Sequence, residues 1–227
     1  MIRSLFASSL VVAWFGRTTS ATVQGFDISH YQSSVDFGAA YSQGARFVII
    51  KASEGTTVQD TLYSQHVAGA KAAGLLYGAY HFARPGSSTG TAEASYFLEN
   101  GGSWTSGGGN LPGMLDLENN PSGAQCYGLS TSEIITWIGQ FVDTYLSSTG
   151  RYPMIYTTAN WWTACTGNTK QYSSCPLVLA RYNTAPGTVP GGWSAQTIWQ
   201  NSDSYTYGGD SDVFNGDQSA LVALASG

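Results

Sequence analysis

Two carboxylic acids separated by a single residue give the strongest chemical signal in the chain. Asp116 and Glu118 lie in the apolar stretch 113–118, which is typical of a strand. Side chains two residues apart in a strand share one face and lie roughly 6–7 Å apart. Neighbouring carboxylates repel each other, so the pKa of one rises and that group can remain protonated. An acid beside a carboxylate is the pair that glycosidic bond cleavage requires.

Two further acids occupy comparable places. Asp27 ends the first apolar run, and Asp212 opens the last one, two residues after Asp210. Carboxyl ends of barrel strands converge on one mouth, where the chemistry of such folds is carried out. We therefore predict that Asp27 and Asp212 join the pair. The alternative for the Asp116–Glu118 pair is a solvated loop or a structural ion pair with Arg151 or Arg181.

Aromatic and amide side chains follow the other strand ends. Sugar rings pack their C–H faces on aromatic rings, and amides can hold their hydroxyls. We expect such contacts from four residues: Tyr80, Tyr156, Tyr182 and Trp199. Any one of these aromatics could equally belong to the core, but several beside acids at consecutive strand ends favour a sugar-binding site.

The histidines do not define a site of their own. His30 and His81 follow strand ends and could line a pocket, whereas His66 falls within a helical pattern as a surface or structural residue. The chain contains neither a G-x-S-x-G motif nor a phosphate-binding P-loop. A metal site built from these histidines and the acids would match no specific ligand set, so we expect no metal and no cofactor.

Strands alternate with helical segments along most of the chain. Helices are expected near 61–73, 91–99 and 130–150, and the last third is expected to lack helices. This alternation predicts parallel βαβ units in one α/β domain, as a closed TIM-like barrel rather than an open doubly wound sheet. No glycine fingerprint for a dinucleotide follows the first strand. The expected strands are 23–28, 46–52, 75–82, 113–118, 153–157, 177–182, 197–200 and, more weakly, 212–214.

Composition and the first residues indicate an exported protein. The 227 residues are 42% hydrophobic and only 10% charged, which excludes a disordered chain. Residues 1–21 resemble a secretory signal peptide, with Arg3, an apolar stretch and small residues up to Ala21. Its removal leaves a single domain, 22–227, with seven basic and fourteen acidic residues and a net charge of −7. We expect a secreted, extracellular monomer that binds neither nucleic acid nor membrane.

Several motifs, taken in order, resemble glycoside hydrolase family 25, and particularly its fungal N,O-diacetylmuramidases. The resemblance runs from about Val23 to the C-terminus, and four motifs carry it: GFDIS at 25–29 with YQ at 31–32, FVIIKASEG at 47–55, GAYHF at 78–82 and LDLE at 115–118.

This resemblance implies a flattened barrel of five β/α units followed by three strands, the (β/α)5(β)3 type. It also implies hydrolysis of the β-1,4 bond between N-acetylmuramic acid and N-acetylglucosamine in bacterial peptidoglycan. By position, Glu118 matches the general acid. Asp116 matches the residue that stabilises the substrate N-acetyl group in a retaining, substrate-assisted route. Asp27 matches the first-strand acid and Asp212 the last-strand acid, with Asp210 close enough to be the alternative.

The barrel also suggests how the three cysteines pair. Cys126 follows the fourth strand and Cys165 the fifth, so both belong to loops on one barrel face. Cys175 directly precedes the sixth strand, on the opposite face. Since a disulfide needs Cα atoms within about 7 Å, we predict a Cys126–Cys165 bridge and a free Cys175.

Two other functions remain open from the residues. A chitinase-like hydrolase would need a longer run of acids, yet Met114 stands where one of them would fall. A non-catalytic glycan-binding protein would keep the aromatics with idle acids. Repulsion between the acidic protein and anionic walls also leads us to expect an acidic activity optimum.

Overall fold

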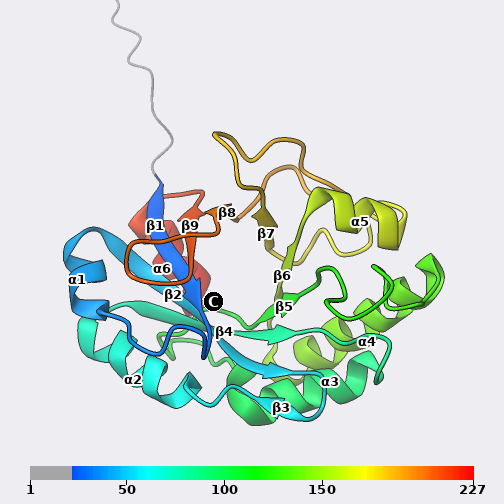
Figure 1. Ribbon diagram of the computed structural model, residues 1–227, viewed down its shortest axis with the longest axis horizontal. Coiled ribbons are helices and arrows are strands. Elements are labelled where there is room, and N and C mark those ends of the chain that lie inside the picture. Colours follow the sequence, from blue (N-terminus) through cyan, green and yellow to red (C-terminus); the bar gives the residue numbers. More distant parts are fainter. Residues whose placement is uncertain (1–21) are drawn as a thin grey trace, which may run out of the picture.

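The computed structural model describes residues 22–227, and the expected signal peptide at 1–21 lies outside the described residues. Eight strands form a closed barrel, and a ninth short strand, β3, extends from the edge of β2 (Figure 1). The strands are β1 Val23–Ile28, β2 Ala45–Glu54, β3 Val58–Gln59, β4 Leu76–Phe82, β5 Met114–Asp116, β6 Met154–Thr157, β7 Leu177–Ala180, β8 Ile198–Ser202 and β9 Asp210–Phe214.

Helices follow the first five barrel strands, whereas β7, β8 and β9 are joined by loops. In Figure 1, α1 to α4 cover one side of the barrel and the loops around β7 and β8 form the other. The expected (β/α)5(β)3 barrel is therefore confirmed. The helices are α1 Phe37–Ser42, α2 Tyr63–Ala73, α3 Gly90–Phe97 with a π-helical turn Leu98–Gly102, α4 Thr131–Thr149, α5 Ala159–Thr166 and α6 Gln218–Ser226.

Closure of the barrel depends on β1. It pairs in parallel with β2 on one side and antiparallel with β9 on the other. The strands from β4 to β8 pair in parallel in chain order, and β9 returns antiparallel between β8 and β1. An open doubly wound sheet has two free edges, so this pairing excludes that alternative.

Alternation along each strand sorts side chains into an interior and an exterior layer. The interior cluster includes Phe47, Met114, Val178 and Ile198. Leu115 and Leu117 are fully buried in the exterior layer against α3 and α4, as the alternation predicts. The next interior positions toward the carboxyl ends of the parallel strands are polar, and their side chains face the cleft described below.

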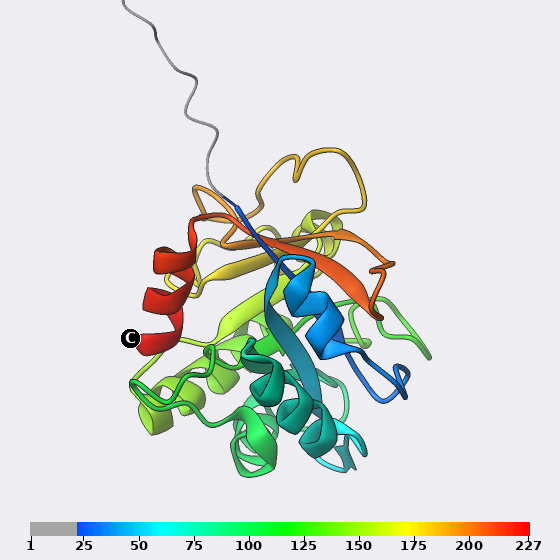
Figure 2. The same ribbon diagram turned by 90° about the vertical axis from the view of Figure 1, so that its left-hand side faces the viewer.

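Helix α6 closes the end of the barrel where the parallel strands begin. Leu221 and Ala225 pack into the interior cluster, and the Trp104 indole nitrogen donates to the Ala225 carbonyl at 3.1 Å. Figure 2 shows α6 in red at this end, with the C-terminus beside it. No helix in the described part of the chain is long and apolar enough to cross a membrane.

The prediction that the last third lacks helices is wrong, because α5 and α6 both lie there. Each has a cap: the side chain of Thr158 accepts from the Trp161 amide, and that of Asp217 accepts from the Ala220 amide. Such caps offset part of the cost of a short helix, and burial of one apolar face supplies the rest. Helix α1, which is only six residues long, was not predicted either.

The cysteines are arranged as expected. Cys126 and Cys165 form a disulfide with a Cα–Cα distance of 5.4 Å, linking the loop after β5 to α5. Cys175 is a free, buried thiol in the exterior layer.

Candidate active site

A cleft of about 230 Å³ opens at the carboxyl ends of the parallel strands. Six of the eight catalytic and sugar-binding residues expected from the sequence line it: Asp27, Asp116, Glu118, Tyr80, Tyr156 and Tyr182. Asp210, Lys51, Gln200 and the rim residue Tyr31 also line the cleft. The structure therefore brings together acids from β1, β5 and β9 with tyrosines from three other strand ends.

Backbone pairing holds Asp116 and Glu118 at the end of β5. The Ala83 amide donates to the Asp116 carbonyl at 3.0 Å, and the Leu117 amide donates to the Tyr156 carbonyl at 2.9 Å. These bonds continue the β4–β5–β6 pairing past the last strand residue. Both acidic side chains consequently face the cleft while Leu117 is buried on the other side.

Burial and mutual repulsion alter the acidity of this pair. Burial, followed by the charge of Glu118, raises the pKa of Asp116 well above its ordinary value. Burial also raises the pKa of Glu118, and Asp210 adds to the effect. The Lys51 ammonium group opposes both shifts. A pair whose members resist double ionisation can hold one proton, which is the state that general acid catalysis requires.

Lys51 was missed as a site residue, although it interrupts an apolar strand at an interior position. Its Nζ lies 2.7 Å from Glu54 Oε2, and Arg84 binds the other oxygen of Glu54 through Nε at 2.9 Å. Glu54 thus holds the two cations next to the acidic pair. Only 7% of Lys51 is exposed, so its charge acts in a poorly solvated setting.

Gln200 connects Asp27 to the tyrosines. Its Nε2 donates to Asp27 Oδ2 at 2.8 Å, and its Oε1 accepts from Tyr156 Oη at 2.8 Å and from Tyr182 Oη at 3.0 Å. Burial, followed by the charge of Asp210, raises the pKa of Asp27 to about 7. Amides at strand ends were expected to hold sugar hydroxyls, but this central position of Gln200 was not predicted.

The last strand contributes two acids in different places. Asp210 lines the cleft, whereas Asp212 is 1% exposed and does not line it. Asp212 pairs in register with Gln200 and Gly25, beneath the cleft floor. No N–H or hydroxyl group of the described residues donates to its carboxyl oxygens, which are placed to share a proton with the Asp27 carboxyl. Burial, followed by the charge of Asp27, raises the pKa of Asp212 well above its ordinary value. Of the two residues that the sequence left open, Asp210 is the one at the cleft surface.

Trp199 also lies apart from the cleft. It precedes the interior residue Gln200 in β8 and therefore faces the other side of the sheet. Its indole nitrogen donates to the Arg181 carbonyl at 2.8 Å, outside the cleft lining. Tyr31 instead stands at the rim with 81% of its surface exposed, an accessible aromatic face that the sequence interpretation did not include among the sugar-binding residues.

The histidines have structural partners. His81, one of the two histidines that could line a pocket, is fully buried in the exterior layer. Its Nδ1 lies 2.8 Å from Ser53 Oγ and its Nε2 lies 2.9 Å from Glu93 Oε2. His30 Nδ1 lies 2.8 Å from Asp60 Oδ2, and His66 contacts the Gln32 carbonyl at 3.0 Å. Across residues 22–227, no three His, Cys, Asp or Glu side chains are grouped to hold a metal ion.

A closed (β/α)5(β)3 barrel with carboxyl groups gathered at its mouth defines the class of barrel hydrolases that act by acid–base chemistry. A family model, "Glycosyl hydrolases family 25", matches residues 26–210. The chain belongs to this family and is a glycoside hydrolase.

Named relatives cover nearly the whole chain. An N,O-diacetylmuramidase of Arthroderma benhamiae is 53% identical over 211 residues, which are 92% of this chain and 89% of the relative. An N,O-diacetylmuramidase of a Chalaropsis species is 54% identical over 91% of this chain and 100% of its own length. The solved structure of a family GH25 lysozyme from Aspergillus fumigatus superposes with a TM-score of 0.90 at 58% identity, covering 91% of this chain and 100% of that one.

Proposed function

We propose that this protein is a muramidase that hydrolyses the β-1,4 bond between N-acetylmuramic acid and N-acetylglucosamine in bacterial peptidoglycan. The observation that carries the proposal is the shared cleft of Asp116, Glu118 and Asp27 at the barrel mouth. The curated relatives named N,O-diacetylmuramidase support the choice of bond. Tyrosines on the same cleft wall supply the flat, partly polar surfaces to which sugar rings bind.

In the proposed reaction, Glu118 acts first as general acid. Its proton passes to the glycosidic oxygen as the bond between that oxygen and C1 of the muramic acid breaks. The N-acetyl oxygen of the same sugar forms a bond to C1, and Asp116 stabilises the positive charge that develops on the N-acetyl nitrogen. Water then attacks C1, its proton returns to Glu118, and the N-acetyl group is released with retained configuration at C1.

The remaining polar groups position the substrate in this scheme. Gln200 holds Asp27 and the hydroxyls of Tyr156 and Tyr182 in one hydrogen-bonded set, so a sugar meets a preformed surface. The Lys51 ammonium group lowers the pKa of both Asp116 and Glu118, so it offsets part of the rise caused by burial and makes the proton of the pair easier to transfer.

Secretion is part of the proposal. The signal-like segment 1–21 and the domain that follows it, 22–227, fit export to a place where bacterial walls are met. The Cys126–Cys165 disulfide fits an oxidising compartment. N-terminal sequencing of protein from culture medium tests this step, since cleavage after Ala21 leaves a chain that begins at Thr22.

Mass spectrometry of borohydride-reduced fragments tests the activity. Purified peptidoglycan is incubated with the wild type or with Glu118→Gln, and the new reducing ends are identified. Reduced muramic acid ends made by the wild type alone are the expected result.

The other outcomes separate the alternatives. Reduced glucosamine ends would show that the other bond is cut. Release of chitin fragments without peptidoglycan fragments would favour a chitinase-like hydrolase. No new ends from either protein would favour a glycan-binding protein.

A further inference from the structure

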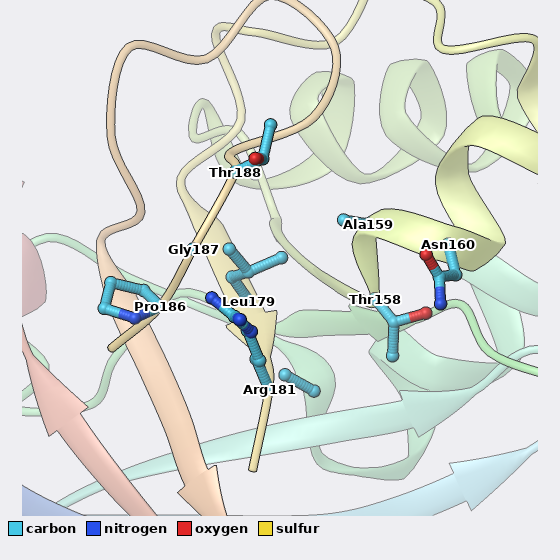
Figure 3. Close-up of a pocket in the computed structure, with 9 residues that line it drawn as sticks. Thr158, Ala159, Asn160, Leu179, Arg181, Pro186, Gly187 and Thr188 are labelled. Atoms are coloured by element: carbon cyan, nitrogen blue, oxygen red, sulfur yellow. The ribbon is translucent and has the colours of Figure 1, made fainter. Parts of the chain in front are cut away.

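A second hollow lies at the barrel mouth, outside the wall of the acidic cleft. It measures about 440 Å³. One wall is Arg181 with the end of β7, the facing wall is the start of α5 with Thr158 and Asn160, and the loop at 186–188 forms the third (Figure 3). None of the proposed catalytic groups lines this hollow.

The hollow adjoins the cleft at the ends of two strands, β6 and β7. Tyr182 faces the cleft and Arg181 faces the hollow, as expected from alternation past the end of β7. Tyr156 likewise lines the cleft, and Thr158, two residues further on, lines the hollow. A ligand that passes over the rim at Tyr182 can therefore occupy both.

The loop that follows β7 holds the Arg181 guanidinium in place. Arg181 Nη1 donates to the Ala185 carbonyl at 3.2 Å. Gly187 has φ +74°, and a Cβ atom at this position would collide with the guanidinium. The backbone of Gly187 thus packs directly against Arg181, which limits the side-chain freedom that binding would otherwise remove.

Arg181 also carries an uncompensated charge. Among the described residues, Lys51 and Arg84 form ion pairs with Glu54, and two histidines each contact another carboxylate. None of these ion pairs includes Arg181. No carboxylate lines the hollow. A lone guanidinium with free donors, in a mature chain of net charge −7, is a local site for an anion.

We propose that this hollow binds a carboxylate of the stem peptide that the muramic acid carries, and the inference rests on the proposed function. The planar guanidinium matches a carboxylate in two parallel hydrogen bonds. The peptide is joined to the sugar whose bond is cut, so it starts in the cleft. Four extended residues span about 13 Å, which is enough to cross the strand wall from Tyr182 to Arg181.

Steady-state kinetics on two soluble substrates test the proposal. Both come from one peptidoglycan preparation treated with hydrofluoric acid to remove phosphate polymers. One keeps its stem peptides, and an amidase has removed them from the other. For Arg181→Gln we expect kcat/KM on the peptide-bearing glycan to fall about 10-fold, mostly through KM, as for the loss of one charge-assisted hydrogen bond. Activity on the stripped glycan should not change.

Lys170→Gln is the matched control, because it removes the same charge from an exposed residue outside both cavities. It should leave both substrates unaffected. Gly187→Ala should reproduce the selective loss by displacing the guanidinium, and circular dichroism would verify that it folds.

Three outcomes would overturn the inference while leaving the proposed function standing. Equal losses on both substrates, or no loss on either, would remove the link to the peptide. A loss seen only with walls that retain their phosphate polymers would identify a phosphate ligand instead. If the wild type cut neither substrate, the proposed function itself would fail.

Discussion

Gln200 and Asp27 are joined by a 2.8 Å hydrogen bond from Nε2 to Oδ2, across strands that do not pair directly with each other. The same amide accepts hydrogen bonds from Tyr156 and Tyr182. One side chain in β8 therefore sets the orientation of an acid from β1 and of two tyrosines from the ends of β6 and β7.

Replacement of Gln200 by methionine should raise the pKa of Asp27 above its value of about 7, because the lost hydrogen bond stabilises the ionised carboxylate. Carboxyl-carbon NMR titration of the wild type and the variant measures this directly. The Tyr182→Phe variant removes one bond to the same amide but none to Asp27 and is the control. An unchanged or lowered pKa in Gln200→Met would contradict the assigned direction.

Glu118→Gln should lower kcat by at least about 10³-fold, since it removes the group that donates the proton. The wild-type rate should fall as pH rises through the upper titration of the Asp116–Glu118 pair, because burial keeps a proton on the pair only below that point. A pH–rate profile on soluble glycan checks this. A maximum above pH 8 would argue against Glu118 as the acid. Unfolding temperatures of both proteins should be compared to exclude a folding defect.

Stability should decrease as pH rises from about 4 to about 7. Burial raises the folded-state pKa of Asp27, Asp116 and Asp212, so the folded protein holds protons that the unfolded chain releases. A group of this kind contributes its full stability below its unfolded pKa and loses it as pH passes through the folded value. Urea unfolding at pH 4.5 and pH 8 measures the difference.

The variant Asp212→Asn should reduce that difference, because it replaces a buried ionisable group without changing its size. Its free energy of unfolding at pH 8 should exceed that of the wild type. The exposed carboxylate Glu99 offers the control substitution Glu99→Gln, for which no such gain is expected. A wild type that is more stable at pH 8 than at pH 4.5 would refute the sign of the effect.

Reduction of the Cys126–Cys165 disulfide should lower the free energy of unfolding by about 3–4 kcal/mol, as estimated for a bridge that closes a loop of this length. The two cysteines are 39 residues apart in sequence. Double substitution Cys126→Ala/Cys165→Ala, compared with the wild type in urea, gives the value. Cys175 serves as an internal check, because burial raises the pKa of its thiol to about 12 and the folded protein should resist alkylation there.

Strand alternation accounts for how much of the site could be predicted from the sequence. The two-residue spacing of Asp116 and Glu118 places both in the cleft whatever the details of neighbouring strands. By the same argument Lys51 could have been found, as the one cation at an interior position of β2. The choice between Asp210 and Asp212 could not be made from the sequence, because residues two apart in a strand face the same side of the sheet. It depends on how far along β1 and β8 the last strand pairs, and that register is a long-range property.

The alternation of side chains along a strand also explains why two other residues, Trp199 and His81, lie away from the cleft. Trp199 and His81 each precede or follow an interior residue, Gln200 and Tyr80, and therefore face outward. The short helices α1 and α5 were missed because their stability comes from caps and from packing on the barrel, not from a long periodic pattern.

The position of α6 has a practical consequence for attaching the protein to other objects. The Gly107 amide donates to the Ser226 carbonyl at 3.2 Å, so the last residues are held against the closed end of the barrel, away from the cleft. A linker added after Gly227 would leave from this end. Enzyme coupled to a bead or fused to a wall-targeting module through its C-terminus would present its open mouth outward, toward an insoluble substrate.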